Sequence, residues 1–220
     1  MTLNYRQSSL AGLAAVALAA FGFCAAQLSA RAEPTATITE APGKLETAIF
    51  ASGCFWCSES DFEKVPGVVS VVSGYTGGQL KNPKYEQVGA GETGHTEAVE
   101  VKFDAAKVSY QSLVGYYWRH TDVVDGGGQF CDRGNQYRPA IFPIDAEQRR
   151  IAQASKEALD KSGVLPAPVA VEITDATTFY PAETYHQDYY KAHSIKYNFY
   201  RQGCGRDARL KALWGKEAGH

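Results

Sequence analysis

The sequence has no excess of charge of either sign. Lys and Arg together number 22 and Asp and Glu number 24, so the net charge is −2 at pH 7. A domain that binds nucleic acid needs a strongly basic surface, and this balance excludes one, so we expect no nucleic-acid partner. Apolar residues make up 45% and charged residues 21% of the chain, which is typical of a globular protein rather than a disordered one.

Long apolar runs are missing after residue 32. Before that point an Ala- and Leu-rich stretch begins at Leu10 and ends in an A-x-A pattern at residues 30–32, as in a secretory signal peptide. The polar residues Gln27 and Ser29 interrupt the stretch, which argues against an uncleaved membrane span. We predict cleavage after Ala32, a periplasmic or secreted protein, and no stable membrane insertion after cleavage.

Cysteine is scarce in the remainder of the chain, which holds Cys54, Cys57, Cys131 and Cys204. An exported binding domain could pair them as two structural disulfides. A domain of this size can bury a full core without such links, so redox chemistry is indicated at least as strongly. No second C-x-x-C and no paired histidines accompany them, and we therefore predict no metal site.

The hydrophobic pattern predicts one domain over residues 46–220, after a loose Pro- and Thr-rich lead-in at 33–45. Its periodicity predicts strands at 46–52, 68–75, 95–103, 138–142 and 169–173, and helices at 54–65, 109–120, 145–162, 182–193 and 206–214. The stretch 195–205 is expected to be irregular.

This order of elements favours an α+β fold. We predict a two-layer α-β sandwich with a mixed, ferredoxin-like sheet built on a split βαβ unit, extra helices and an irregular C-terminal tail. A doubly wound sheet is the alternative. No Gly-rich phosphate-binding turn follows a strand, which argues against a nucleotide site.

The chemically most informative stretch is Gly53-Cys54-Phe55-Trp56-Cys57, at a predicted strand-to-helix turn. A cysteine in a first helical turn faces unpaired N–H groups and the positive end of the helix dipole, which favour the thiolate and lower the thiol pKa. Two aromatic side chains beside it would form an apolar wall. Simple core packing is the alternative, but it must explain a glycine, two aromatic residues and a second cysteine at one turn.

The same stretch resembles the active-site motif of the A-type peptide methionine sulfoxide reductases, and further motifs follow in the order of that family. They are 73–78 (SGYTGG), 82–85 (NPKY), 94–97 (GHTE), 134–138 (GNQYR), 181–183 (PAE) with 186–187 (HQ), and 203–205 (GCG). The resemblance implies an enzyme that reduces methionine-S-sulfoxide, free or in oxidised proteins, to methionine. It implies no cofactor, an external thioredoxin-like dithiol as reductant, and a monomer.

The resemblance assigns the chemistry to two residues. Cys54 is expected to attack the sulfoxide sulfur as the nucleophile. A sulfoxide oxygen leaves poorly unless it is protonated, and Glu97 is expected to supply the proton as the general acid. Partial burial of this carboxyl group in its strand would raise its pKa.

Five further residues are expected to hold the substrate. Tyr85 and Tyr137 match positions that hydrogen-bond the sulfoxide oxygen. Phe55 and Trp56 match the pocket for the S-methyl group, and Asp132 matches a loop aspartate that helps to hold the substrate.

A second thiol must then condense with the sulfenic acid left on Cys54 to form a disulfide. The resemblance favours Cys204 for this step. Cys57, one helical turn from Cys54, and Cys131 are alternatives, and many members of the family carry Gly and Asn at these two positions. The alternative function is a thioredoxin-like dithiol–disulfide oxidoreductase that uses Cys54 and Cys57.

Overall fold

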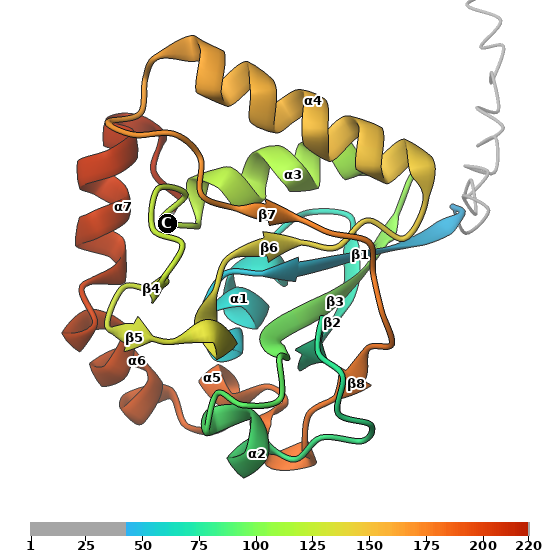
Figure 1. Ribbon diagram of the computed structural model, residues 1–220, viewed down its shortest axis with the longest axis vertical. Coiled ribbons are helices and arrows are strands. Elements are labelled where there is room, and N and C mark those ends of the chain that lie inside the picture. Colours follow the sequence, from blue (N-terminus) through green and yellow to red (C-terminus); the bar gives the residue numbers. More distant parts are fainter. Residues whose placement is uncertain (1–42, 220) are drawn as a thin grey trace, which may run out of the picture. The chain divides into compact units, whose positions relative to one another are not determined.

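The computed structural model describes residues 43–219, so the predicted signal peptide and most of the lead-in lie outside the described residues. A six-stranded sheet of order β7-β6-β1-β3-β2-β8 forms the centre of the described region (Figure 1). Its strands are β1 (Leu45–Ala51), β2 (Val68–Thr76), β3 (Thr96–Asp104), β6 (Ala140–Ile141), β7 (Glu172–Ile173) and β8 (Tyr180–Pro181). Neighbouring strands are antiparallel except β6 and β7, so the sheet is mixed as predicted.

Seven α-helices are described around this sheet: α1 (Phe55–Phe62), α2 (Tyr85–Gly89), α3 (Tyr110–Arg119), α4 (Ala146–Ser162), α5 (Tyr189–Ala192), α6 (Ser194–Gly203) and α7 (Arg206–Trp214). The chain order β1-α1-β2-β3-α3-β6, combined with the spatial order β6-β1-β3-β2, is that of a split βαβ unit. This confirms the predicted α+β, ferredoxin-like fold, and the alternative of a doubly wound sheet is wrong.

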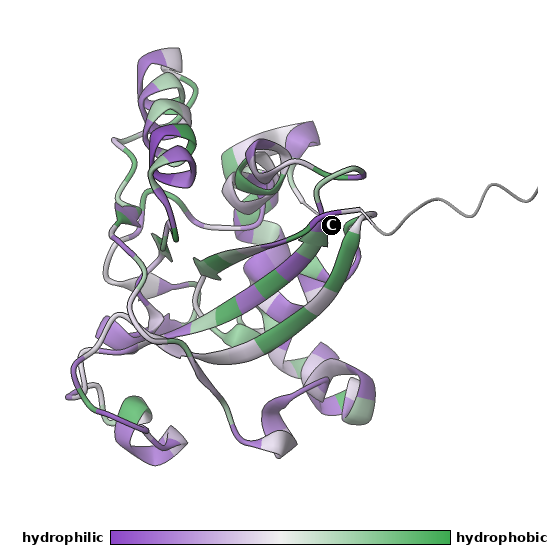
Figure 2. Ribbon diagram, turned by 90° about the vertical axis from the view of Figure 1, so that its right-hand side faces the viewer, coloured by the Kyte–Doolittle hydropathy of each residue, from purple (hydrophilic) through white to green (hydrophobic). Residues whose placement is uncertain are grey.

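The alternation of side chains along β1 places the core. Ala48 and Phe50 point into the main core, while Ile49 and Ala51 belong to a smaller cluster. The main core also takes residues from α1 and α3, and Figure 2 shows hydrophobic and hydrophilic segments alternating along the central strands. A period of two in a strand buries both faces of the sheet against different partners.

Helix ends follow the local sequence. The side chain of Ser109 accepts a hydrogen bond from the Ser112 N–H at the start of α3, and Asp145 does the same for α4. Helix α4 ends at Gly163, whose φ of 67° lies in the left-handed region that glycine favours. This agrees with the predicted helix over residues 145–162.

The C-terminal part differs most from the sequence prediction. The predicted helix at 182–193 is broken at Asp188, which has a φ of 52°, and only a 3₁₀ turn (Thr184–His186) and the short α5 remain. The stretch predicted to be irregular is instead largely the helix α6. Arg201 of α6 donates to Asp61 of α1 at 2.8 Å and to Tyr197 at 3.0 Å. The bond to Asp61 joins α6 to a helix far away in the sequence, and local periodicity does not reveal it.

Short elements were also missed. Helix α2 and strand β8 lie in stretches for which no helix or strand was predicted. The same holds for a hairpin of β4 (Gly128–Gln129) and β5 (Asp132–Arg133). The predicted strands at 138–142 and 169–173 shrink to the two-residue strands β6 and β7.

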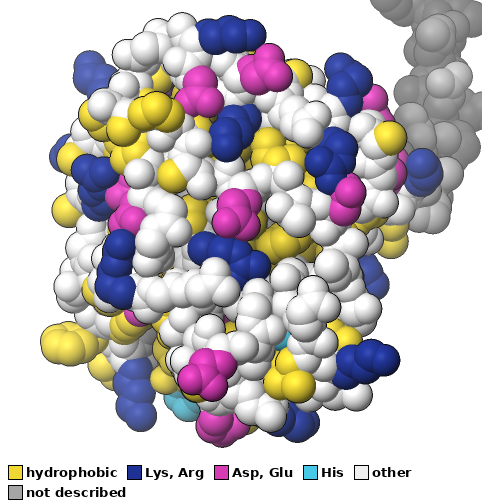
Figure 3. Space-filling view, in the orientation of Figure 1, with side chains coloured by type: hydrophobic (Ala, Val, Ile, Leu, Met, Phe, Trp, Pro, Cys, Tyr) yellow, Lys and Arg dark blue, Asp and Glu magenta, His cyan; other side chains and the backbone are white. Residues whose placement is uncertain are grey.

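The described surface matches the balanced composition. Figure 3 shows basic and acidic side chains interspersed over the face in view. Within residues 43–219, no helix combines the length and the apolar character needed to cross a membrane.

Arg206, at the start of α7, has a fully buried side chain that links three parts of the chain. It donates to the carbonyl oxygens of Ser52 (3.1 Å) and His120 (2.8 Å), and its Nε lies 3.7 Å from a carboxylate oxygen of Asp61. We expect Arg206→Met to lower the free energy of unfolding by about 3–5 kcal/mol, because the change leaves buried acceptors and a buried carboxylate without this partner. Denaturant unfolding measures the loss. The matched variant Arg150→Met removes only an exposed ion pair and should leave the midpoint unchanged; equal losses would contradict the assignment.

Candidate active site

A cavity of about 120 Å³ lies at the N-terminal end of α1. Its lining comprises Cys54, Phe55, Trp56, Tyr85, Glu97, Asp132, Tyr137 and Tyr200. The structure therefore brings together all the predicted nucleophile, acid and substrate-binding residues, and it adds Tyr200. A larger hollow of about 730 Å³ beside α2 contains none of these residues.

The start of α1 brings the predicted nucleophile and the predicted acid together. Cys54 is the N-cap residue, with φ −48° and ψ 118°, and its side chain makes no capping hydrogen bond. Glu97 of β3 caps the helix instead, because its Oε2 accepts a hydrogen bond of 2.9 Å from the Phe55 N–H. Gly53 precedes them with a φ of 82°, and a Cβ there would lie 2.5 Å from the Gln129 side chain, so the turn requires glycine.

The carboxyl group of Glu97 is set up to hold a proton. Burial raises its pKa to about 8, in spite of the Phe55 N–H, which lowers the pKa, while the nearby charge of Asp132 adds to the rise. A carboxyl group with this pKa is mostly protonated at pH 7. It can therefore give a proton to a group in the cavity.

The two thiols of α1 form a linked pair. Burial raises the pKa of Cys54, and the neighbouring Cys57 and Glu97 act in the same direction. A hydrogen bond from Cys54 lowers the pKa of Cys57, and the charges of Arg206 and Arg201 lower it further. The predicted lowering of the Cys54 pKa is thus wrong, because desolvation outweighs the field of the short helix α1.

Two tyrosine hydroxyls and one carboxylate supply the polar side of the cavity. Burial raises the pKa of Tyr85 to about 12 and raises that of Tyr137 as well, so both remain hydrogen-bond donors at neutral pH. Burial also raises the pKa of Asp132, which accepts a hydrogen bond from the Tyr200 hydroxyl.

The aromatic wall is held by residues from the C-terminal part. Tyr189 stacks on Trp56 with ring centroids 3.8 Å apart, and the Trp56 indole N–H donates to His186 Nδ1 at 3.1 Å. The His186 ring also lies 5.0 Å from that of Phe55. The indole therefore has a fixed orientation, and burial lowers the pKa of His186, which keeps Nδ1 free to accept.

The family model described as "Peptide methionine sulfoxide reductase" matches residues 46–218. The chain belongs to this family. It is therefore a methionine sulfoxide reductase and an oxidoreductase, and the alternative prediction of a thioredoxin-like oxidoreductase is wrong.

Relatives of known name agree with this assignment. Peptide methionine sulfoxide reductase MsrA of Listeria innocua is 54% identical over 170 residues, which are 77% of this chain and 96% of the relative. Methionine sulfoxide reductase A of Corynebacterium diphtheriae has a similar structure, with a TM-score of 0.62 and 32% identity over 71% of this chain and 78% of that chain. Reduced Mxr1 of Saccharomyces cerevisiae gives a TM-score of 0.63 and 27% identity over 72% of this chain and 91% of that chain.

Tyr200 is the residue of the reductase cavity that sequence reasoning missed. It lies in α6, in the stretch predicted to be irregular, and no motif pointed to it. Its position one helical turn before Cys204 is the signal that could have found it. Its hydroxyl contacts both Asp132 and the Cys54 side chain, so it connects the two sides of the cavity.

We expect Tyr200→Phe to slow methionine formation in this reductase by roughly 10–100-fold, because the change removes a charge-assisted hydrogen bond to Asp132 in a buried site. A single-turnover assay on reduced protein measures the rate. Tyr190→Phe is the matched control, because the Tyr190 hydroxyl bonds Glu63 instead of a cavity residue. Equal rates in the two variants would remove Tyr200 from the site.

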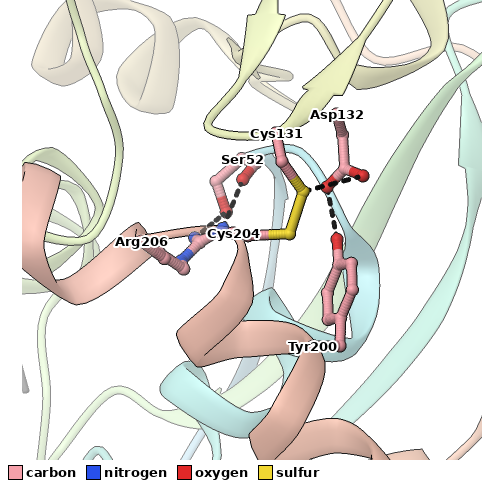
Figure 4. The surroundings of a disulfide bond; sticks show 6 residues. All are labelled: Ser52, Cys131, Asp132, Tyr200, Cys204 and Arg206. Atoms are coloured by element: carbon pink, nitrogen blue, oxygen red, sulfur yellow. Dashed lines mark hydrogen bonds between the residues drawn. A yellow bond between two sulfur atoms is a disulfide. The ribbon is translucent and has the colours of Figure 1, made fainter.

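Cys204 does not line the reductase cavity, and neither do the two alternative resolving residues, Cys57 and Cys131. The structure records Cys204 in a disulfide with Cys131, with Cα atoms 4.8 Å apart (Figure 4). Cys54 and Cys57 are buried free thiols. The alternative of a binding domain with two structural disulfides is therefore wrong, and the predicted bond between Cys54 and Cys204 stays a prediction.

Proposed function

We propose that Cys54 and Glu97 reduce methionine-S-sulfoxide, free or in oxidised proteins, as nucleophile and general acid. The observation that carries this proposal is the hydrogen bond from the Phe55 N–H to Glu97. It fixes the carboxyl group of Glu97 at the start of α1, where Cys54 is the N-cap residue, and both side chains line one cavity.

The proposed step transfers two electrons from Cys54 to the substrate. The Cys54 sulfur attacks the sulfoxide sulfur while Glu97 gives a proton to the sulfoxide oxygen, so that the S–O bond breaks. The proton that the Cys54 thiol loses also goes to this oxygen, which leaves as water and leaves the Cys54 sulfur bonded to the substrate sulfur. Water then attacks the Cys54 sulfur and the bond to the substrate sulfur breaks. Glu97 takes back a proton, methionine leaves, and Cys54 is oxidised to a sulfenic acid.

The other lining residues orient the substrate. The rings of Phe55 and Trp56 cover the S-methyl group, and the hydroxyls of Tyr85 and Tyr137 donate to the oxygen. A methyl group alone is worth only about 1–3 kcal/mol of discrimination in an apolar pocket, so the choice of epimer needs the hydroxyls on one side as well.

The test uses reduced protein and each sulfoxide epimer separately, without an external reductant. We expect methionine to form from the S epimer within the first turnover and only background formation from the R epimer. Equal product from both epimers would contradict the proposed geometry, and absence of product from both would contradict the proposed chemistry.

A dithiol of the thioredoxin class is the proposed external reductant, because the cycle ends in a disulfide that only thiol exchange returns to thiols. The signal-like residues 1–32 support export to the periplasm or beyond. The N-terminal sequence of the protein purified from fractionated cells tests this: a start at residue 33 outside the cytoplasm supports export, and a retained Met1 contradicts cleavage.

A further inference from the structure

A hollow of about 730 Å³ beside α2 takes no part in the proposed chemistry. One wall is formed by α2 and the residue that follows it, through Glu86, Gln87 and Ala90. The rest of the lining comes from loops before and after α2 and includes Leu80 and Glu92. Leu80 is 37% exposed, so this space, which we call the α2 hollow, offers an apolar surface to solvent.

The walls of the α2 hollow are continuous with chain segments that line the reductase cavity. Tyr85, which lines the cavity, is the first residue of α2 and directly precedes Glu86. Thr93 lines the hollow four residues before Glu97, and its hydroxyl accepts a hydrogen bond of 3.2 Å from the His95 N–H. A polypeptide whose oxidised methionine occupies the cavity can therefore extend across α2 into the hollow.

The sizes of the two spaces fit such a substrate. The cavity, at about 120 Å³, is far smaller than the roughly 300–1,000 Å³ of a site that encloses a whole small ligand, so the rest of a peptide must lie outside it. A helix with its side chains is about 10 Å wide. An extended chain covers about 3.3 Å per residue, so the α2 hollow lies roughly three residues along the chain from the oxidised methionine.

Two carboxylates give the α2 hollow a negative charge. Glu86 and Glu92 are both exposed, and neither forms an ion pair with a residue that the structure describes. Glu147 and Glu157 of α4 are also exposed, but each pairs with a basic residue of the same helix. Among the described residues that line the hollow there is no Lys or Arg. The two carboxylates are thus free to meet a positive charge from outside.

A Lys or Arg side chain matches both the apolar and the acidic part of the α2 hollow. Its aliphatic stem can lie against Leu80 and Ala90 while its charged head meets the carboxylates in water. Lys81 and Lys84 of the chain itself precede α2 but do not line the hollow. An acidic side chain in the same place would be repelled.

We propose that the α2 hollow binds a Lys or Arg side chain of the protein substrate, roughly three residues from the oxidised methionine. The inference rests on the proposed function. It names the preferred substrates as oxidised methionines in basic segments. Free methionine-S-sulfoxide does not reach the hollow, so its reduction does not depend on Glu86 and Glu92.

The first experiment compares three peptides that carry Lys, Gln or Glu at the third residue on each side of methionine-S-sulfoxide, with dithiothreitol as reductant. We expect kcat/KM to fall in the order Lys, Gln, Glu, by roughly 2–10-fold between Lys and Gln, which is the usual effect of two exposed charge pairs. The values of kcat should be equal, because the contact is the same in the ground and transition states. Equal kcat/KM for the three peptides would overturn the proposal.

The second experiment repeats these measurements on Glu86→Gln/Glu92→Gln. This variant should reduce the Lys peptide no faster than the Gln peptide and should reduce free methionine-S-sulfoxide as the unaltered protein does. The control Glu147→Gln/Glu157→Gln removes two exposed carboxylates from α4 and should keep the preference for Lys. A preference retained in the first variant, or lost equally in both, would overturn the proposal. Failure of the unaltered protein to reduce any of these substrates would contradict the proposed function instead.

The third experiment fills the α2 hollow without changing its charge. Ala90→Trp should remove the preference for the Lys peptide and leave the reduction of free methionine-S-sulfoxide unchanged. A second copy of the chain is the other occupant that this surface could take, and sedimentation velocity tests for it. We expect a monomer at assay concentrations in both proteins; a dimer that dissociates in Ala90→Trp would overturn the proposal.

Discussion

Replacing Cys54 by serine should abolish the reduction of methionine-S-sulfoxide. A serine hydroxyl is a far weaker nucleophile than a thiol, and it cannot form the sulfenic acid that stores the two electrons. Loss of a covalent nucleophile costs roughly 10⁴–10⁶-fold in rate, so the residual activity should lie at the background level. Methionine formed in a single turnover of reduced protein is the measurement.

The matched control for this loss is Cys57→Ser. It removes a buried thiol from the same helical turn and keeps Cys54 in place. Reduced Cys57→Ser should still release methionine in its first turnover. Activity retained in Cys54→Ser, or a first turnover absent from both variants with their folds intact, would contradict the role of Cys54.

Glu97→Gln should slow the first turnover by roughly 10²–10⁴-fold, the usual contribution of a positioned general acid. Glutamine keeps an oxygen that can accept the Phe55 N–H, so the start of α1 is preserved while the proton is lost. A rapid-quench measurement of methionine formation gives the rate. An unchanged rate would remove Glu97 from the proton-donating role.

The pH dependence gives this prediction a sign. Burial raises the pKa of Glu97 to about 8, so the carboxyl group holds its proton below that pH and loses it above. The rate of the first turnover in unaltered protein should therefore fall as pH rises through about 8, and the Gln variant should lack this fall.

Stability should follow the same carboxyl group. Because the folded pKa is raised above the ordinary value of 4.5, stability from the protonated form is complete below that value and is lost as pH rises through about 8. The denaturant midpoint of unfolding should therefore fall between pH 6 and pH 9, and the fall should be larger for the unaltered protein than for Glu97→Gln. The same midpoints show whether Glu97→Gln is folded at the pH of the assay. If it is, a low activity of this variant is not caused by unfolding.

The sheet and the helices that pack on it were predictable because local patterns determine them. Alternation along 46–52 and 95–103 and the caps at Ser109 and Asp145 need no distant partner. Helix α6 was not predictable in this way, because Arg201 and Tyr197 gain their contacts from α1, far away in the sequence.

The same distinction holds at the site. Six lining residues belong to motifs that resemble one family, and Asp132 matches a loop aspartate of the same family. The structure places all seven around one cavity. Tyr200 has no motif, and the pKa of Cys54 depends on burial and on Cys57, which the dipole argument ignored. The pairing of Cys131 with Cys204 joins positions 73 residues apart, and spacing alone did not select it.

The most direct test of the account uses protein in which Cys57, Cys131 and Cys204 are all replaced by serine. After one equivalent of methionine-S-sulfoxide and dimedone, we predict one methionine per chain and one adduct, mapped to the peptide that contains Cys54. Methionine released while Cys54 remains a free thiol, or an intact sulfoxide in the presence of folded protein, would contradict the account.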